Sequence, residues 1–219
     1  MAKDQPLRTQ IYLMAESGLD PGALGQALEA GAIACVLLRS ADVGDEALRD
    51  AIEALRPIAQ QREVAFLVEN RAALAVETGC DGVHLSQDGM TVKDTREVIG
   101  ADAIVGIYCG AARHAAMAAA EVGTDYVAFG GGPADRWWQT AADPDILSWW
   151  QAIMTAPCVA IVGDDLRTAG KLAEAGADFV AVGPCIWSHP AGPGAAVREL
   201  HTTLGGGESR SDAGQIKDA

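Results

Sequence analysis

Five polar side chains follow apolar runs of this chain and are of types that could do chemistry: Arg39, Glu69, Asn70, Gln87 and Asp88. A guanidinium at such a position would bind phosphate oxygens. Carboxylate and amide oxygens would instead hold a metal ion or a substrate amine. Each residue also has a purely structural interpretation, in which Arg39 pairs with a nearby acid and the others cap the following helix.

Glycines at the ends of later apolar runs form a second group of candidates, because backbone N–H groups can bind phosphate. Gly163 and Gly183 each end such a run, and Gly130-Gly131-Gly132 with Arg136 follows another. The alternative for the glycine run is a plain flexible loop. Pro184 weakens the prediction at Gly183, because proline donates no N–H.

The histidine and tryptophan residues are ambiguous on sequence alone. His84 lies within an apolar run, so we expect a core histidine rather than a catalytic one. The pairs Trp137-Trp138 and Trp149-Trp150 stand out in a chain that is only 5% aromatic. They would stack on a flat heterocycle, form a dimer contact or fill the core, and the sequence leaves these three roles open.

A repeated pattern predicts the elements that position these residues. The segment Glu174–Gly183 (EAGADFVAVG) recurs nearly intact at Glu121–Gly130 and more weakly at Glu77–Leu85 and Glu29–Leu37. In each copy a helix ends, a glycine (31, 79, 123 or 176) supplies a left-handed residue, and a buried strand follows. The glycines recur about every 48 residues, a spacing that fits two strand–helix units, so four copies predict eight units.

The individual elements alternate strictly along the chain. Strands are predicted at 11–14, 33–39, 64–68, 82–85, 103–107, 126–129, 158–162 and 179–182. Helices are predicted at 21–30, 45–61, 71–78, 91–99, 111–121, 144–155, 165–175 and 194–204. Strands that are apolar on both faces indicate a parallel sheet covered by helices.

Eight units favour a single-domain α/β fold, the closed (β/α)8 TIM barrel, with an open doubly wound sheet as the alternative. A dinucleotide-binding fold is not favoured, since no Gly-x-Gly-x-x-Gly lies between the first strand and helix. In a barrel the carboxyl ends of all strands meet at one face, where the candidate residues would converge. We expect a lead-in at residues 1–10, the barrel at 11–204 and a disordered tail at 205–219.

The charge of the chain limits its partners. A formal net charge of −14, with lysine only at positions 3, 93, 171 and 217, opposes a nucleic-acid or anionic-membrane surface. An anionic small substrate would need arginine, a metal ion or helix N-termini. The sequence leaves open whether the chain forms a homo-oligomer.

The five cysteines are scattered, and no Cys-x-x-Cys pair occurs. They predict buried free thiols in a reducing compartment. Since no signal peptide or long apolar span is visible, we expect a cytoplasmic protein.

One segment is specific enough to indicate a family. Cys80–Asp88 reads CDGVHLSQD, close to the A-D-G-V-H-L-G-Q-E of the small barrels that include thiamine phosphate synthases and thiazole tautomerases. Shorter matches are Val36–Arg39, Val68–Arg71, Val105–Ile107 and Ala175–Asp178. The chain resembles this superfamily over roughly residues 11–204.

The resemblance implies a reaction and its requirements. Family synthases join a pyrimidine pyrophosphate to a thiazole phosphate and release pyrophosphate. That chemistry implies Mg²⁺ and a cationic clamp, because the charge that grows on the leaving group must be neutralised. Arg39 matches the family arginine, Glu69 and Asn70 stand at the family Asn-Asp pair, and Gln87 and Asp88 lie in the family segment.

Several positions depart from the family pattern. The metal-binding aspartate falls on Gly89, although Asp88 is adjacent, and the lysine two residues beyond the arginine is Ala41. The T-x-T-K loop is replaced by residues 133–138, so Arg136 is the candidate to replace the missing lysine.

The expected function is therefore a thiamine phosphate synthase-like barrel that binds a phosphorylated heterocycle. One alternative is a metal-free tautomerase-like isomerase that uses Glu69 or His84 as acid or base. Another is a non-catalytic phosphate-binding barrel.

Overall fold

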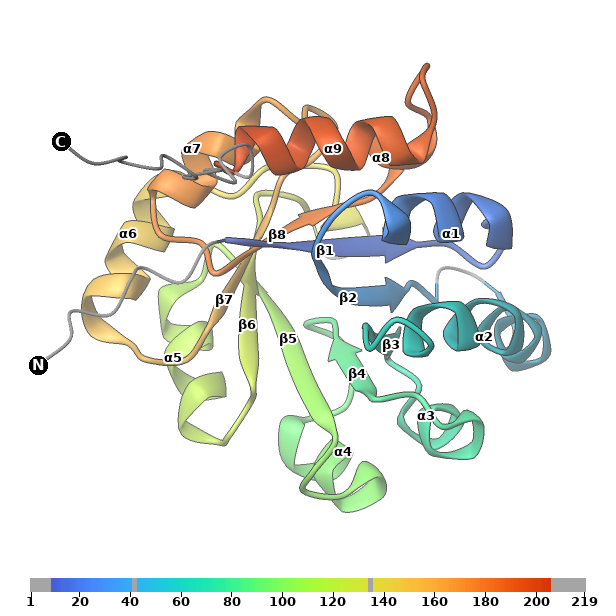
Figure 1. The fold of residues 1–219 in the computed structure, drawn as a ribbon. Helices are drawn as coiled ribbons and strands as arrows, with labels where there is room; N and C mark the ends of the chain where they lie inside the picture. The colour runs from blue at the N-terminus through green and yellow to red at the C-terminus, as the bar shows by residue number, and fades with distance from the viewer. Residues whose placement is uncertain (1–8, 41–42, 134–135, 206–219) are drawn as a thin grey trace, which may run out of the picture.

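The protein is a closed barrel of eight parallel strands with helices on its outside (Figure 1). The structure is a computed structural model that describes residues 9–40, 43–133 and 136–205. The strands are β1 (Gln10–Ala15), β2 (Ile33–Leu38), β3 (Ala65–Glu69), β4 (Gly82–Leu85), β5 (Ile104–Gly110), β6 (Tyr126–Phe129), β7 (Cys158–Ile161) and β8 (Phe179–Val182). They pair in chain order, and β8 closes the sheet against β1. The predicted (β/α)8 barrel is confirmed, and the open sheet is excluded.

Helices follow the strands around the barrel. Those of the described residues are α1 (Pro21–Glu29), α2 (Asp45–Gln60), α3 (Ala72–Thr78), α4 (Val92–Ile99), α5 (Arg113–Glu121), α6 (Pro144–Ile153), α7 (Thr168–Glu174), α8 (Pro184–Trp187) and α9 (Pro193–Thr203). Figure 1 shows β1 and β2 pointing to the right, so the carboxyl ends of these strands lie on that side. None of these helices is long and apolar enough to cross a membrane.

The aspartates of the repeated segment fix the starts of neighbouring strands. Each accepts a hydrogen bond through Oδ2 from a backbone N–H near the start of the preceding strand. The pairs are Asp81 with Phe66, Asp125 with Val105 and Asp178 with Cys158, at 2.7, 2.7 and 2.8 Å. In the fourth copy Ile33 stands at this position. The aspartate of the repeat is therefore a structural residue that sets strand register.

Two apolar layers stabilise the barrel. The outer layer lies between the strands and the helices, and includes residues such as Leu24, Phe66 and Trp150. The inner layer fills the barrel and consists of Tyr12, Met14, Cys35, Leu37, Leu67, Tyr108, Tyr126, Ala128, Trp137, Val159, Ile161 and Ala181. Because the interior is packed, a ligand site has to be built at one end of it.

The structure differs from the predicted elements at three places. Strand β5 continues to Gly110, so Tyr108 and Cys109 lie within the strand rather than after it. The single turn α8 was not predicted, because four residues carry no helical periodicity. Gly79, Gly123 and Gly176 have positive φ as expected, but Gly31 does not; a Cβ there would lie 3.1 Å from the Val197 side chain of α9.

The remaining expectations have mixed outcomes. All five cysteines are free, as predicted, but only Cys35, Cys109 and Cys158 are buried, while Cys80 and Cys185 are partly exposed. The predicted disordered tail lies outside the described residues except for Gly205, and so do Ala41 and most of the predicted lead-in.

Candidate active site

Arg39 lies at the carboxyl end of β2 and is the central cation of the candidate site. It is buried, only 3% exposed, although it is charged. Its Nη1 donates to Glu16 Oε1 at 3.0 Å, while its Nε has no hydrogen-bond partner. Burial lowers the pKa of the guanidinium, and the carboxylates of Glu69 and Glu16 oppose that shift. A buried guanidinium with an unused donor is suited to binding an anion.

A cleft lies beside Arg39 at the ends of β1, β2 and β8. Its volume is about 530 Å³, and its lining is Met14, Glu16, Gly18, Leu19, Arg39, Pro184, Trp187 and Ser188. Trp187 is held in place by its Nε1, which donates to the carbonyl of Met14 at 2.7 Å. Arg39 therefore faces a space large enough for a small phosphorylated ligand.

Glu69 ends β3 and is almost completely buried. Its Oε2 accepts the N–H of Ser40 at 2.9 Å, and its Oε1 accepts Nε1 of Trp137 at 2.9 Å. Both carboxylate oxygens are thus occupied by protein donors. In this structure Glu69 holds the segment after β6 against the end of β3 and is not presented to a ligand.

Trp137 and Trp138 come from that segment and cover part of the barrel mouth. Trp137 is 1% exposed and stacks on His84, with ring centroids 5.0 Å apart. Trp138 lies at 88° to Trp137, and its ring centroid is 3.1 Å from Cζ of Arg39. Of the three roles left open by the sequence, core filling applies to Trp137.

His84 belongs to a polar chain inside the barrel. Its Nδ1 is 2.9 Å from the hydroxyl of Tyr126, which is 2.8 Å from the hydroxyl of Tyr12. Gly106 makes room for this chain, since a Cβ there would lie 1.9 Å from Cζ of Tyr126. Burial lowers the pKa of His84 to about 3. His84 is therefore a neutral core histidine, as expected, and it does not line the cleft.

The ends of β3 and β4 are joined by a side-chain amide. Asn70 Oδ1 accepts the N–H of Ser86 at 2.9 Å, and Asn70 Nδ2 donates to Ser86 Oγ at 2.8 Å. Asn70 adopts φ of 53°, a left-handed conformation that asparagine tolerates better than most residues. We call this arrangement the Asn70–Ser86 clamp.

The family's metal positions do not fit Mg²⁺ in this chain. Asn70 is neutral and uses both amide atoms in the clamp, and Gly89 supplies no ligand. A Cβ at Gly89 would lie 2.5 Å from Asn70 Oδ1, so the clamp occupies the space that a side chain there would need. Asp88 is exposed beside them. Within residues 9–40, 43–133 and 136–205, no three His, Cys, Asp or Glu side chains are grouped to hold a metal ion.

The predicted phosphate-binding glycines are brought to the same end of the barrel. Gly163 has φ of 74°, and a Cβ there would lie 2.9 Å from the carbonyl of Gln139, so the segment after β6 packs over it. In the glycine run, the N–H groups of Gly130 and Gly131 already donate to the carbonyls of Gly110 and Thr140. That run is part of the folded loop and offers fewer free donors than expected.

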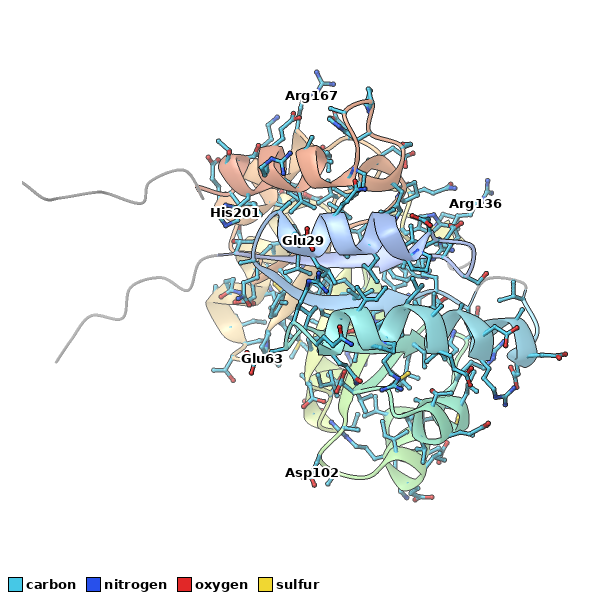
Figure 2. The ribbon with its side chains drawn as sticks, turned by 45° about the vertical axis from the view of Figure 1, so that its right-hand side comes forward. Glu29, Glu63, Asp102, Arg136, Arg167 and His201 are labelled. Carbon is cyan, nitrogen blue, oxygen red and sulfur yellow. The ribbon has the colours of Figure 1, made fainter. Side chains whose placement is uncertain are left out.

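The other three predicted residues differ in exposure, since Gly183 is buried whereas Gln87 and Arg136 are exposed. Gly183 precedes α8, which is too short to act as a helical anion site. Gln87 is exposed after β4. Figure 2 shows Arg136 at the end of the molecule toward which β1 and β2 point, with its side chain directed away from the barrel.

Sequence reasoning missed the residues that connect these candidates. The contacts of Tyr12 with Tyr126 and of Trp187 with Met14 join elements far apart in the chain, and no local spacing in the sequence predicts them. The tryptophan pair was a usable signal for the mouth, because two adjacent indoles in a loop of an aromatic-poor chain need a buried partner.

Comparisons with known proteins show the family to which the chain belongs. A family model described as thiamine monophosphate synthase matches residues 11–186. The thiamine-phosphate synthase of Rhodospirillum centenum is 48% identical over 205 residues, which cover 90% of this chain and 98% of that protein. The corresponding protein of Hyphomonas neptunium is 39% identical, with 89% and 93% covered.

A solved structure supports the fold. Thiamine phosphate pyrophosphorylase from Pyrococcus furiosus matches with a TM-score of 0.78 at 22% identity, over 91% of this chain and 97% of that chain. Fold and site together define a (β/α)8 barrel with a buried arginine facing a cleft at the carboxyl ends of its strands. The chain belongs to the thiamine monophosphate synthase family.

Proposed function

We propose that this protein is a thiamine-phosphate synthase, which joins a pyrimidine pyrophosphate to a thiazole phosphate. The near full-length similarity to proteins of that name supports the reaction class. The observation that carries the site is Arg39, a buried guanidinium with an unpartnered Nε beside a cleft of about 530 Å³.

The reaction makes a clear demand on the site. The thiazole nitrogen gives its electron pair to the carbon that bears the pyrophosphate, and the carbon–oxygen bond breaks with its electrons leaving on pyrophosphate. The negative charge on the leaving group rises as that bond breaks. Arg39 stabilises this charge, and its burial makes the interaction stronger than it would be in water.

The remaining predicted site residues keep weaker roles in this proposal. Gly163 and Gly183 lie near the thiazole phosphate, Gln87 contacts a substrate, and Arg136 adds positive charge at the rim. Mg²⁺ is usually held by one or two carboxylates together with substrate phosphates. Asp88 is the carboxylate next to the altered family positions, and we assign the protein's part in any Mg²⁺ binding to it. The cytoplasmic location stays a prediction.

The direct test supplies purified protein with both precursors, in Mg²⁺ or in EDTA, and quantifies thiamine phosphate. We expect product formation. Binding of one precursor without product would instead support the non-catalytic barrel. Isomerisation of a thiazole carboxylate phosphate alone would support the tautomerase-like alternative, for which Glu69 and His84 are poorly presented in this structure.

The role of Arg39 gives a specific prediction. Arg39→Lys keeps the charge but loses the planar fork, and Arg39→Leu loses both. Removing one preorganised donor to a developing anion lowers kcat by about 10²- to 10³-fold, so we expect kcat/KM to fall by at least about 10²-fold for Arg39→Leu and less for Arg39→Lys.

Arg49→Leu is the matched control, because Arg49 makes an exposed ion pair with Glu77 on the helical outside of the barrel. Its kcat/KM should equal that of the unaltered protein. Equal activity of Arg39→Leu and Arg49→Leu would remove Arg39 from the mechanism.

A further inference from the structure

The two adjacent tryptophans after β6 each contact one charged side chain of the barrel mouth. Trp137 donates to Glu69 through Nε1 at 2.9 Å, and the face of Trp138 packs on Arg39, 3.1 Å from Cζ to the ring centroid. Arg39 directly follows β2 and Glu69 ends β3, and these two strands are neighbours in the sheet. One short segment therefore contacts both charges.

The Trp138 ring is the contact best placed to fix the orientation of Arg39. The Glu16 side chain that pairs with Arg39 is 62% exposed, and ion pairs to exposed carboxylates are weak restraints. Glu69 already accepts two hydrogen bonds from other donors. A guanidinium stacked on an indole face keeps its N–H groups in the plane, where an anion can reach them.

Trp138 is itself held by a continuous set of contacts that leads into the barrel. Its ring meets Trp137 edge to face at 6.1 Å, and Trp137 stacks on His84 at 5.0 Å. His84 in turn contacts Tyr126 through Nδ1. The packed interior therefore supports the ring against which Arg39 lies.

We propose that Trp138 is a positioning residue for anion binding. It orients the Arg39 guanidinium toward the cleft lined by Glu16, Trp187 and Ser188. Trp137, which is hydrogen-bonded to Glu69, anchors Trp138 in turn. The indole that follows β6 thus acts here by fixing an arginine that follows β2, a strand that is not adjacent to β6 in the sheet. This inference rests on the proposed function only for the identity of the anion.

The first experiment measures affinity for inorganic pyrophosphate by calorimetry in Trp138→Leu and Trp138→Phe. Loss of the indole face should weaken binding roughly tenfold. Phenylalanine keeps an aromatic face and should restore most of the affinity. In turnover assays Trp138→Leu should raise KM for the pyrimidine pyrophosphate more than KM for the thiazole phosphate.

The chain offers a matched control. Trp149 on α6 also packs against an arginine, with Arg113 Cζ 4.8 Å from its ring centroid, but it lies in the outer layer away from the cleft. Trp149→Leu should leave pyrophosphate affinity unchanged. Equal losses in Trp138→Leu and Trp149→Leu would overturn the proposal, because a general loss of packing would then explain both.

A second readout does not depend on the reaction. An aromatic face displaces the NMR signal of a stacked guanidinium, so the Arg39 Nε–H resonance should be shifted in the unaltered protein and normal in Trp138→Leu. Its disappearance in Arg39→Lys assigns it. An unshifted signal, or one unaffected by Trp138→Leu, would overturn the positioning role. Failure of the unaltered protein to bind pyrophosphate, with the shifted signal present, would count against the proposed function and leave the Trp138–Arg39 contact standing.

Discussion

At the scale of single residues, the burial of His84 inside the barrel makes the stability of the folded protein depend on pH. Burial holds its pKa at about 3 in the folded protein, against about 6.5 in an unfolded chain. Between these values the unfolded chain binds a proton that the folded protein does not. Stability should therefore fall as the pH drops below about 6, with His84 contributing a loss of about 1.4 kcal/mol per pH unit.

Urea unfolding of the unaltered protein and His84→Asn at pH 4, 5, 6 and 7 measures this contribution. Asparagine places a polar atom near the position of Nδ1 and can still pair with Tyr126, but it does not titrate. The variant should show a shallower fall in unfolding free energy with acid. His114→Asn, on the exposed surface of α5, is the control and should follow the unaltered protein. Parallel curves for His84→Asn would contradict the low pKa.

The residue scale also shows where sequence reasoning succeeded. Arg39, Glu69 and Asn70 were predicted at strand ends because polar residues directly follow apolar runs, and the structure brings all three to the mouth. Their partners could not be predicted in the same way. Trp137 lies 68 positions from Glu69, and only the closed barrel brings an indole N–H to that carboxylate.

At the scale of elements, the Asn70–Ser86 clamp determines how the ends of β3 and β4 are joined. Gly89→Ala would place a Cβ 2.5 Å from Asn70 Oδ1. Asn70 would have to turn away and lose its hydrogen bonds to Ser86. We expect a loss of about 1–2 kcal/mol in unfolding free energy, measured by urea denaturation.

Gly25→Ala provides the control for this substitution. Gly25 lies inside α1, and a methyl group added there would meet no other atom within 4 Å, so alanine should stabilise the protein by about 0.5–1 kcal/mol. An unchanged stability of Gly89→Ala would show that the clamp contributes little. A stronger affinity for Mn²⁺ in Asn70→Asp would support the view that the neutral amide is what disfavours a metal ion here.

Element positions were predicted well where two signals coincide. Strands β4, β6, β7 and β8 are short apolar runs that each come after the end of a helix. Three of them, β4, β6 and β8, directly follow the strand-fixing aspartate. Prediction failed where a signal is lacking. Strand β5 runs on through an irregular register between Tyr108 and Gly110, and α8 is too short to show periodicity.

At the scale of the whole molecule, the fourfold repeat was enough to predict a closed barrel, because each unit must bury its apolar faces against neighbours on both sides. It could not predict the chemistry, since one barrel architecture hosts many reactions. The metal positions illustrate this limit: Cys80–Asp88 resembles the family segment, while Asn70 and Gly89 change what the ends of β3 and β4 can bind.

Net charge gives a prediction that no single side chain would suggest. The chain carries a formal charge of −14, and its proposed substrates are anions. At long range the protein should repel pyrophosphate, and only close to the cleft should Arg39 attract it. Raising NaCl from 10 to 150 mM shortens the screening length from about 30 to about 8 Å. The association rate should then rise by about three- to tenfold, whereas the dissociation rate, set by the buried contact to Arg39, should change less.

Stopped-flow tryptophan fluorescence at several salt concentrations would measure both rates, with Trp138 as the nearby reporter. An uncharged pyrimidine alcohol serves as the control ligand, and its association rate should not depend on NaCl. If pyrophosphate association slows as salt is added, the local positive field around Arg39 extends beyond the cleft and outweighs the negative surface. That result would mean that the barrel mouth attracts its substrates, and that the overall acidity of the chain has no influence on their capture.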